Sequence, residues 1–305
     1  MNPRIKKPTA LKKSPLEIIS KKWILKLFFK VALTALAAYM VIRKIDLNET
    51  KRILLTAHLF WLFWALILFN ISKWISAARL NLYFKMIRLN LTFKYNLILY
   101  YVGMFYNLFL PGGIGGDGYK VYLLNKKYKT SVRSLIGATL LDRVNGMVAL
   151  IFLALLLLLF IDFSYAEISW TYYLIGLLIL SYPVFYFFIR MFFKQFSGSF
   201  FKINLASFGV QISQLICALF ILWSLDIRSL YIEYQVLFLL SSIVAVLPFT
   251  IGGIGARELV FVFGANYLMI DKNAAVAFSL LFFVLTAVSS FSGTFLEWKL
   301  NHQNS

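Results

Sequence analysis

Residues 111–120 read Pro-Gly-Gly-Ile-Gly-Gly-Asp-Gly-Tyr-Lys (PGGIGGDGYK), and they follow directly on the apolar run LYYVGMFYNLFL at residues 99–110. The stretch has five glycines, one carboxylate and one lysine at a point where a membrane helix would otherwise continue. Backbone polar groups have no water to bond in the bilayer core, so non-helical backbone survives there only when protein buries it or a wet cavity adjoins it. The stretch therefore predicts a broken helix beside a cavity.

The composition is that of a membrane protein. The chain has 305 residues, of which 61% are hydrophobic and only 14% charged, whereas a soluble domain is about half apolar. The single cysteine, Cys217, excludes an internal disulfide and a cysteine-based zinc site, and only two histidines are present. We therefore expect no metal and no cofactor.

The net charge of +19 has a membrane explanation. Lysines and arginines gather in the short loops and the N-terminal segment, as expected for cytoplasmic loops that face anionic lipid. No basic domain stands apart from the apolar runs, so we expect anionic lipid as a partner at those loops and no nucleic acid.

The fold class predicted from the apolar runs is all-α, a polytopic membrane helical bundle with about six full spans and two re-entrant helical hairpins. The full spans are expected at 23–42, 54–72, 134–161, 172–190, 205–225 and 274–298. The interrupted segments are 95–125, broken by PGGIGGDG, and 234–270, broken by PFTIGGIGARE.

The distribution of basic residues favours hairpins over full crossings. With the basic N-terminal tail in the cytoplasm, a hairpin at 95–125 keeps the basic loops 73–94, 126–133 and 190–204 on the same side. A full crossing would place the later basic loops outside. The loop 43–52 is an exception, because it is predicted to be external and yet contains four basic residues.

The resulting order repeats once along the chain. Span, span, hairpin and span in residues 23–161 are followed by the same elements in 172–298, which enter from the opposite face. This is the pattern of an inverted repeat, in which broken helices of two halves meet at a transport site. The predicted organisation is a basic cytoplasmic tail (1–22), one transmembrane domain (23–298) and a short cytoplasmic tail (299–305), integral to the cell membrane.

The two glycine-rich breaks supply candidate head-group contacts. Glycine lets backbone approach a ligand closely and turn its N–H groups toward an anion, although small residues also serve for tight turns and close helix packing. Each break is followed by charged side chains at the start of a helix. The candidates in and after the breaks are Gly112, Gly113, Gly115, Gly116, Asp117, Lys120, Gly252, Gly253, Gly255, Arg257 and Glu258.

Three further polar residues belong to the predicted site. Asp142 and Arg143 lie early in a long apolar helix, where charged side chains face inward or form pairs. They either line the cavity or form an interfacial ion pair, and Asp117 with Arg143 or Asp142 with Lys120 are the expected partners. Asn107 precedes the first break and is expected either to cap the broken helix or to meet a head group.

The segment SAARLNLYFKMIRLNLTF, residues 76–93, mixes basic and apolar residues. We expect it to form an interfacial helix that rests on anionic lipid.

Three motifs together resemble one protein family. In order along the chain they are FYNLFLPGGIGGDGYKVYLL (105–124), LLDRVNGMVAL (140–150) and LPFTIGGIGARE (247–258). They look like the lysylphosphatidylglycerol synthase transmembrane-region family of flippase-like membrane proteins, over residues 20–298. The family positions that match are Asn107, Pro111, the glycines through Gly116, Asp117, Asp142, Arg143, Gly252, Gly253, Gly255 and Glu258.

The resemblance implies a lipid-handling bundle whose re-entrant elements line a cavity. In full-length synthases of the family, a soluble C-terminal domain transfers the aminoacyl group and the membrane region moves the modified lipid between leaflets. We expect that soluble domain to be absent here and an enzymatic role to be disfavoured. Stand-alone members are associated with polyprenyl-linked sugars and the cell envelope, so the cargo does not carry over.

The leading hypothesis is a transporter or flippase for a phospholipid or polyprenyl-linked lipid. The alternatives are a membrane-embedded transferase that acts on a polyprenyl-phosphate substrate and an accessory subunit of an envelope pathway. The expected protein partner is either a second copy of this chain, in a homo-oligomer, or an envelope-pathway enzyme.

Overall fold

The computed structural model describes residues 21–109, 115–161, 170–246, 253 and 255–302. Within those residues every regular element is a helix. The helices are α1 (Lys21–Ile42), α2 (Leu47–Leu55), α3 (Leu59–Met86), α4 (Phe93–Phe109), α5 (Gly115–Tyr128), α6 (Val132–Leu158), α7 (Trp170–Phe192), η2 (Lys194–Ser199), α8 (Phe200–Ser224), α9 (Tyr231–Val246), α10 (Ala256–Tyr267) and α11 (Lys272–His302).

Five helical segments among the described residues are long and apolar enough to cross a membrane. They are Leu59–Met86, Val132–Leu158, Trp170–Phe192, Lys194–Ser224 and Lys272–Glu297. Each overlaps one of the six predicted spans, although the span predicted at 54–72 begins at Leu59 and continues to Met86. The remaining one, 23–42, forms the 22-residue helix α1, and its crossing stays a prediction. The chain is thus a multi-pass, all-helical membrane protein.

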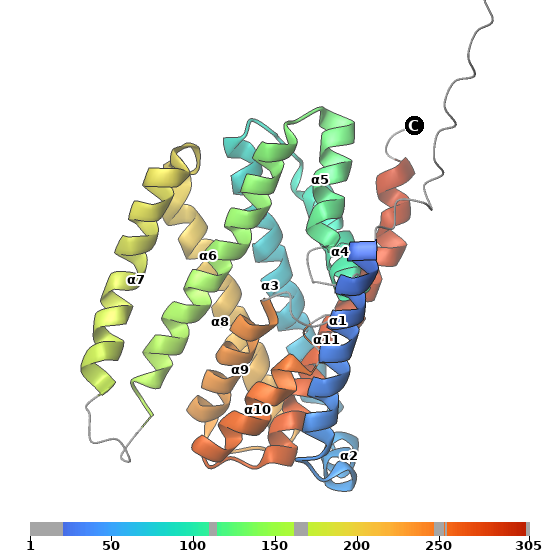
Figure 1. Cartoon of the computed structure of the whole chain (residues 1–305), viewed down its shortest axis with the longest axis vertical. Coiled ribbons are helices and arrows are strands. Elements are labelled where there is room, and N and C mark those ends of the chain that lie inside the picture. The colour runs from blue at the N-terminus through green and yellow to red at the C-terminus, as the bar shows by residue number, and fades with distance from the viewer. Residues whose placement is uncertain (1–20, 110–114, 162–169, 247–252, 254, 303–305) are drawn as a thin grey trace, which may run out of the picture.

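The helices pack around a centre made by α3 and α8, which form the most extensive contact in the bundle. Helix α4 packs against α11, and α6 packs against α9. Aromatic rings fill this core, including Phe69, Phe238 and Phe282, which pack with ring centroids 4.8–5.7 Å apart. Helix α7 packs mainly against α6 and η2 and lies at one edge of the molecule (Figure 1).

The two predicted hairpins are pairs of short helices. Helices α4 and α5 have 17 and 14 residues, and α9 and α10 have 16 and 12. At 1.5 Å per residue, none exceeds about 26 Å, against a hydrocarbon core of about 30 Å. Figure 1 shows α5 at one end of the bundle and α9 with α10 at the other. The breaks at 110–114 and 247–252 lie outside the described residues, so the re-entrant path and the inverted repeat stay predictions.

Glycine allows close approach within the first hairpin. A Cβ atom at Gly116 of α5 would overlap the backbone of Gly103 in α4. Because both partners are backbone, neither helix can relieve that overlap by a side-chain movement. The α4–α5 contact therefore requires glycine at position 116.

One sequence prediction is wrong. Residues 76–93 do not form a separate interfacial helix, because α3 continues without interruption from Leu59 to Met86. Arg79, Leu80, Tyr83 and Phe84 are buried in the bundle. The stretch mixes polar and apolar residues, and members of both kinds are buried inside the protein. In the sequence, such a mixture looks the same as that of a helix that lies at the membrane surface.

The basic stretch 43–52 is also more ordered than a loop. Asp46 caps α2 by accepting hydrogen bonds from the N–H groups of Asn48 and Glu49 at 2.8 and 3.1 Å. Asn273 at the start of α11 accepts from the Asp46 N–H at 2.8 Å and donates to Glu49 at 2.6 Å. The two acidic residues thus fasten α2 to α11.

Replacing Gly116 by alanine is expected to lower the free energy of unfolding by about 1–3 kcal/mol, the usual cost of overpacking. The measurement is thermal unfolding of the detergent-purified protein. Gly118→Ala is the matched control, because a Cβ at that position of the same helix would have no other described atom within 4 Å and alanine favours helix by up to about 1 kcal/mol. Equal behaviour of the two variants would contradict the proposed close contact.

Candidate functional site

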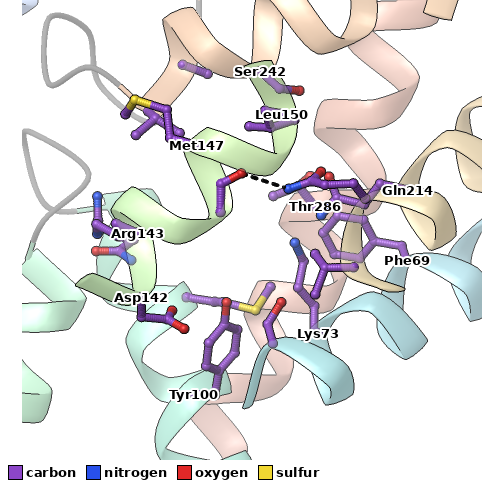
Figure 2. Close-up of a pocket in the computed structure, with 18 of the residues that line it drawn as sticks. Phe69, Lys73, Tyr100, Asp142, Arg143, Met147, Leu150, Gln214, Ser242 and Thr286 are labelled. Atoms are coloured by element: carbon purple, nitrogen blue, oxygen red, sulfur yellow. Dashed lines mark hydrogen bonds between the residues drawn. The ribbon is translucent and has the colours of Figure 1, made fainter. Parts of the chain in front are cut away.

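A cavity of about 320 Å³ lies at the centre of the bundle. Eight helices contribute to its wall, namely α3, α4, α5, α6, α8, α9, α10 and α11. The side chains in Figure 2 include apolar ones such as Phe69 and Leu150 and polar ones such as Gln214 and Thr286. The cavity is therefore shared by both halves of the chain.

The lining is rich in charge. It contains five cationic side chains and two carboxylates, which leaves a surplus of three positive charges. The charged residues are Lys73, Arg79, Lys120, Arg143, Arg257, Asp117 and Asp142. Charges within a membrane bundle are costly unless paired, and they commonly mark substrate or ion pathways.

Asp117 joins the first hairpin to α6. One of its oxygens accepts a hydrogen bond from Lys120 Nζ at 3.1 Å, and the other accepts from Arg143 Nε. Lys120 Nζ also lies 4.5 Å from the centre of the Tyr100 ring in α4, and a Cβ at Gly103 would overlap its side chain. The predicted Asp117–Arg143 pair is confirmed, and Lys120 shares the same carboxylate.

Asp142 pairs with a residue that the sequence did not suggest. Arg79 Nε of α3 donates to Asp142 Oδ1 at 2.8 Å, and both side chains are at least nine-tenths buried. The predicted Asp142–Lys120 pair is therefore wrong, because Lys120 is directed to Asp117. Asp142 and Arg143 both line the cavity, where Figure 2 shows them on the α6 side.

A polar network extends from this pair into α8. Arg79 Nη1 donates to Ser207 Oγ at 2.8 Å, and Ser207 donates to Asn145 Oδ1. Asn145 Nδ2 donates in turn to Asn204 Oδ1 at 2.8 Å. Helices α3, α6 and α8 are thus tied together through satisfied buried groups, an arrangement that fixes their relative positions.

Two cations in the cavity have no carboxylate partner among the described residues: Lys73 and Arg257. Lys73 Nζ lies 4.3 Å from the centre of the Phe69 ring, and Arg257 Cζ lies 4.8 Å from the centre of the Phe282 ring. Cation–π contact offsets only part of the cost of a desolvated charge. These two cations account for most of the positive surplus.

The second hairpin has its own cap. Gly255 precedes α10 with φ of +80°, and its N–H donates to Glu258 Oε2 at 2.7 Å. The other oxygen of Glu258 accepts from Ser279 Oγ at 2.8 Å. Gly253 also has a positive φ, of +81°, which glycine adopts without strain. Glu258 is therefore buried in structural hydrogen bonds and does not line the cavity.

Asn107 caps a helix, which is one of its two predicted roles. Its Oδ1 accepts a hydrogen bond from the Gly116 N–H at 2.8 Å, so it caps the first turn of α5 from the end of α4. It also lines the cavity.

The structure brings together six of the predicted site residues in the cavity wall: Asn107, Asp117, Lys120, Asp142, Arg143 and Arg257. Five other predicted residues do not contribute to its wall: Gly115, Gly116, Gly253, Gly255 and Glu258. The predicted Gly112, Gly113 and Gly252 lie outside the described residues.

Sequence reasoning missed Lys73 and Arg79. Both lie in α3, in the run FNISKWISAARL, and the concentration of basic residues after residue 72 predicts a cytoplasmic loop there. The signal that could have found them is an apolar pattern that continues past both residues, which predicts charges inside a helix. Among the described residues, no group of three His, Cys, Asp or Glu side chains could hold a metal ion.

The family described as "Lysylphosphatidylglycerol synthase TM region" matches residues 27–207. The chain belongs to this family. The match covers α3, the first hairpin and the α6 charges, and it ends at Ser207 within the first third of α8. No curated protein sequence matches the chain significantly.

Replacing Asp142 by asparagine is expected to destabilise the protein by about 3–5 kcal/mol, because it leaves Arg79 buried without its counter-charge. Thermal unfolding measures the loss. Asp226→Asn is the control, since the Asp226–Arg228 pair has side chains that are 73% and 53% exposed and exposed pairs contribute about 0–1 kcal/mol. A loss for Asp142→Asn no larger than that of the control would contradict the buried pairing.

Proposed function

We propose that this protein moves a lipid with an anionic head group between the two leaflets of the cell membrane. The head group would enter the central cavity, and the hydrophobic tails would stay in the bilayer. The single observation that carries the proposal is the surplus of three positive charges in a cavity enclosed by membrane helices. An anionic head group would supply the missing counter-charge. The hydrophobic tails would stay in the lipid outside the apolar helices that surround the cavity.

The arrangement of contacts supports an alternating-access mechanism. Contacts in the half 23–161 have counterparts in the half 172–298: α4 packs against α11 as α9 packs against α6, and α5 packs against α6 as α10 packs against α11. We infer that the halves form an inverted repeat whose hairpins α4–α5 and α9–α10 are re-entrant from opposite faces. Rocking of such halves exposes a central site to each side in turn.

The orientation follows from charge. Basic residues gather at the end of the bundle that holds the α3–α4, α5–α6 and α7–α8 connections, including Lys85, Lys126 and Lys194. We propose that this end faces the cytoplasm, where anionic lipid attracts Lys and Arg.

The test is leaflet exchange in proteoliposomes. Fluorescent phosphatidylglycerol and phosphatidic acid are followed by chemical quenching of the outer leaflet. We expect exchange faster than in protein-free liposomes and at least tenfold slower with Arg143→Ala, because the phosphate loses a cation and Asp117 loses a partner. An Asp117→Asn variant should also slow exchange.

Arg133→Ala is the matched control, because Arg133 is an exposed arginine at the start of the same helix α6. Its exchange rate should equal that of the unaltered protein. Exchange no faster than in protein-free liposomes, or equal rates for the two arginine variants, would overturn the proposed transport.

A further inference from the structure

The cavity has two electrically different sides. On one side, Asp117 and Asp142 form ion pairs with Lys120, Arg143 and Arg79, so each of these cations has a carboxylate partner and one positive charge remains. On the other side, Lys73 and Arg257 have no carboxylate partner within the described parts of the chain. In Figure 2, the Lys73 side chain lies across the cavity from Asp142 and Arg143 and beside Gln214 and Thr286.

Lys73 and Arg257 come from different halves of the chain and are held by one aromatic pair. Each cation rests on a ring, Lys73 on Phe69 and Arg257 on Phe282. The two rings contact each other edge to face, with centroids 5.7 Å apart, and both are almost fully buried. Both positive charges therefore lie on the part of the cavity wall to which these two rings belong.

The nearest acidic residue in the sequence is already occupied. Glu258 follows Arg257 directly, but its two oxygens are bound to the Gly255 N–H and the Ser279 hydroxyl. The neighbouring segment 247–254 and the segment 110–114 contain no acidic residue in the sequence. Neither the described residues nor these two segments supply a counter-charge on this side, and an anionic ligand would supply one.

Unpartnered polar atoms in the same cavity wall also point to a ligand. Ser242 Oγ and Gln211 Oε1 are buried and have no hydrogen-bond partner among the described residues, and the two residues are 6% and 4% exposed. Buried polar groups are rarely left unsatisfied without a functional reason. Ser242 lies on α9 one turn before Ala245, which is 3.1 Å from where a Cβ of Gly253 would lie. That Cβ position is also 3.7 Å from Arg257 Nε, so Arg257 adjoins the end of α9 that carries Ser242, and both residues line the cavity.

We propose that Lys73 and Arg257 form a phosphate clamp that selects head groups with at least two negative charges, such as a phosphomonoester or a diphosphate. This inference rests on the proposed lipid-binding function of the cavity and narrows its substrate class. A phosphodiester carries one negative charge and leaves a cation of the clamp unpaired. A phosphomonoester carries about 1.5–2 charges at neutral pH, and a diphosphate carries more. Ser242 supplies a hydroxyl donor to the same phosphate, and Gln211 supplies an acceptor for a hydroxyl on the head group.

Equilibrium binding to detergent-purified protein tests the clamp without requiring transport. The probes share one pair of tails: dioctanoyl phosphatidylglycerol, dioctanoyl phosphatidic acid and dioctanoylglycerol diphosphate. The ligand-dependent rise in Tm at several concentrations yields each Kd. We expect the monoester and the diphosphate to bind at least about tenfold more tightly than the diester.

Lys73→Met and Arg257→Met should each weaken binding of the monoester and the diphosphate by at least about tenfold and leave the diester nearly unaffected. Lys85→Met is the matched control, since Lys85 is exposed at the end of the same helix α3. Lys73→Arg should retain the charge preference.

The ligand-free Tm separates the clamp from a structural role. Removal of a charge that has no counter-charge should leave the Tm unchanged or raise it, whereas removal of a side chain with a structural role would lower it. Equal affinity for the three lipids, or a preference that survives Lys73→Met and Arg257→Met, would overturn the clamp. Leaflet exchange with equal affinities would leave the transport proposal standing and refute only the clamp. Charge-selective binding without leaflet exchange would support the clamp and refute the transport proposal.

Discussion

The ion pair between Arg79 and Asp142 is the interaction on which the centre of the bundle depends. A guanidinium and a carboxylate buried among apolar helices are tolerable only together, and their remaining hydrogen-bonding groups also need partners. Arg79 satisfies this condition by binding Ser207 as well, so α3, α6 and α8 are positioned by one connected set of polar contacts. The wall of the cavity is built on that set.

Glycine serves this arrangement by providing space rather than flexibility. Gly146 leaves room for the Arg79 guanidinium, whose nitrogens lie 3.4 Å from where a Cβ would be. Gly103 does the same for Lys120, and Gly116 brings α5 against α4. The two interpretations of the glycine-rich motif, close packing and a ligand site, are therefore not alternatives. Close packing is what brings Asp117 and Lys120 to the cavity.

The two sides of the cavity differ in charge, and this difference gives them different roles. On the α5–α6 side every cation has a carboxylate partner, so that side holds its shape without a ligand. The side formed by Lys73 and Arg257 retains positive charge among described residues that cannot neutralise it. In a membrane interior this difference has a direct consequence, because a charge without a counter-charge is costly and an anion that binds beside it lowers that cost.

The sequence by itself determined the class of the protein, most of its long helices and the family to which it belongs. Apolar runs of about 20 residues specify membrane helices because the bilayer thickness sets their length, and the motifs around Asp117 and Asp142 identified one side of the cavity. Only the tertiary structure decided that α3 carries Lys73 and Arg79 into the core and that Asp142 pairs with Arg79 rather than Lys120. The reason is physical: the partner of a buried charge is set by which helices pack together, and residues 79 and 142 meet only because α3 and α6 do. A sequence shows that a charge lies in an apolar run, but the packing of the helices decides what neutralises it.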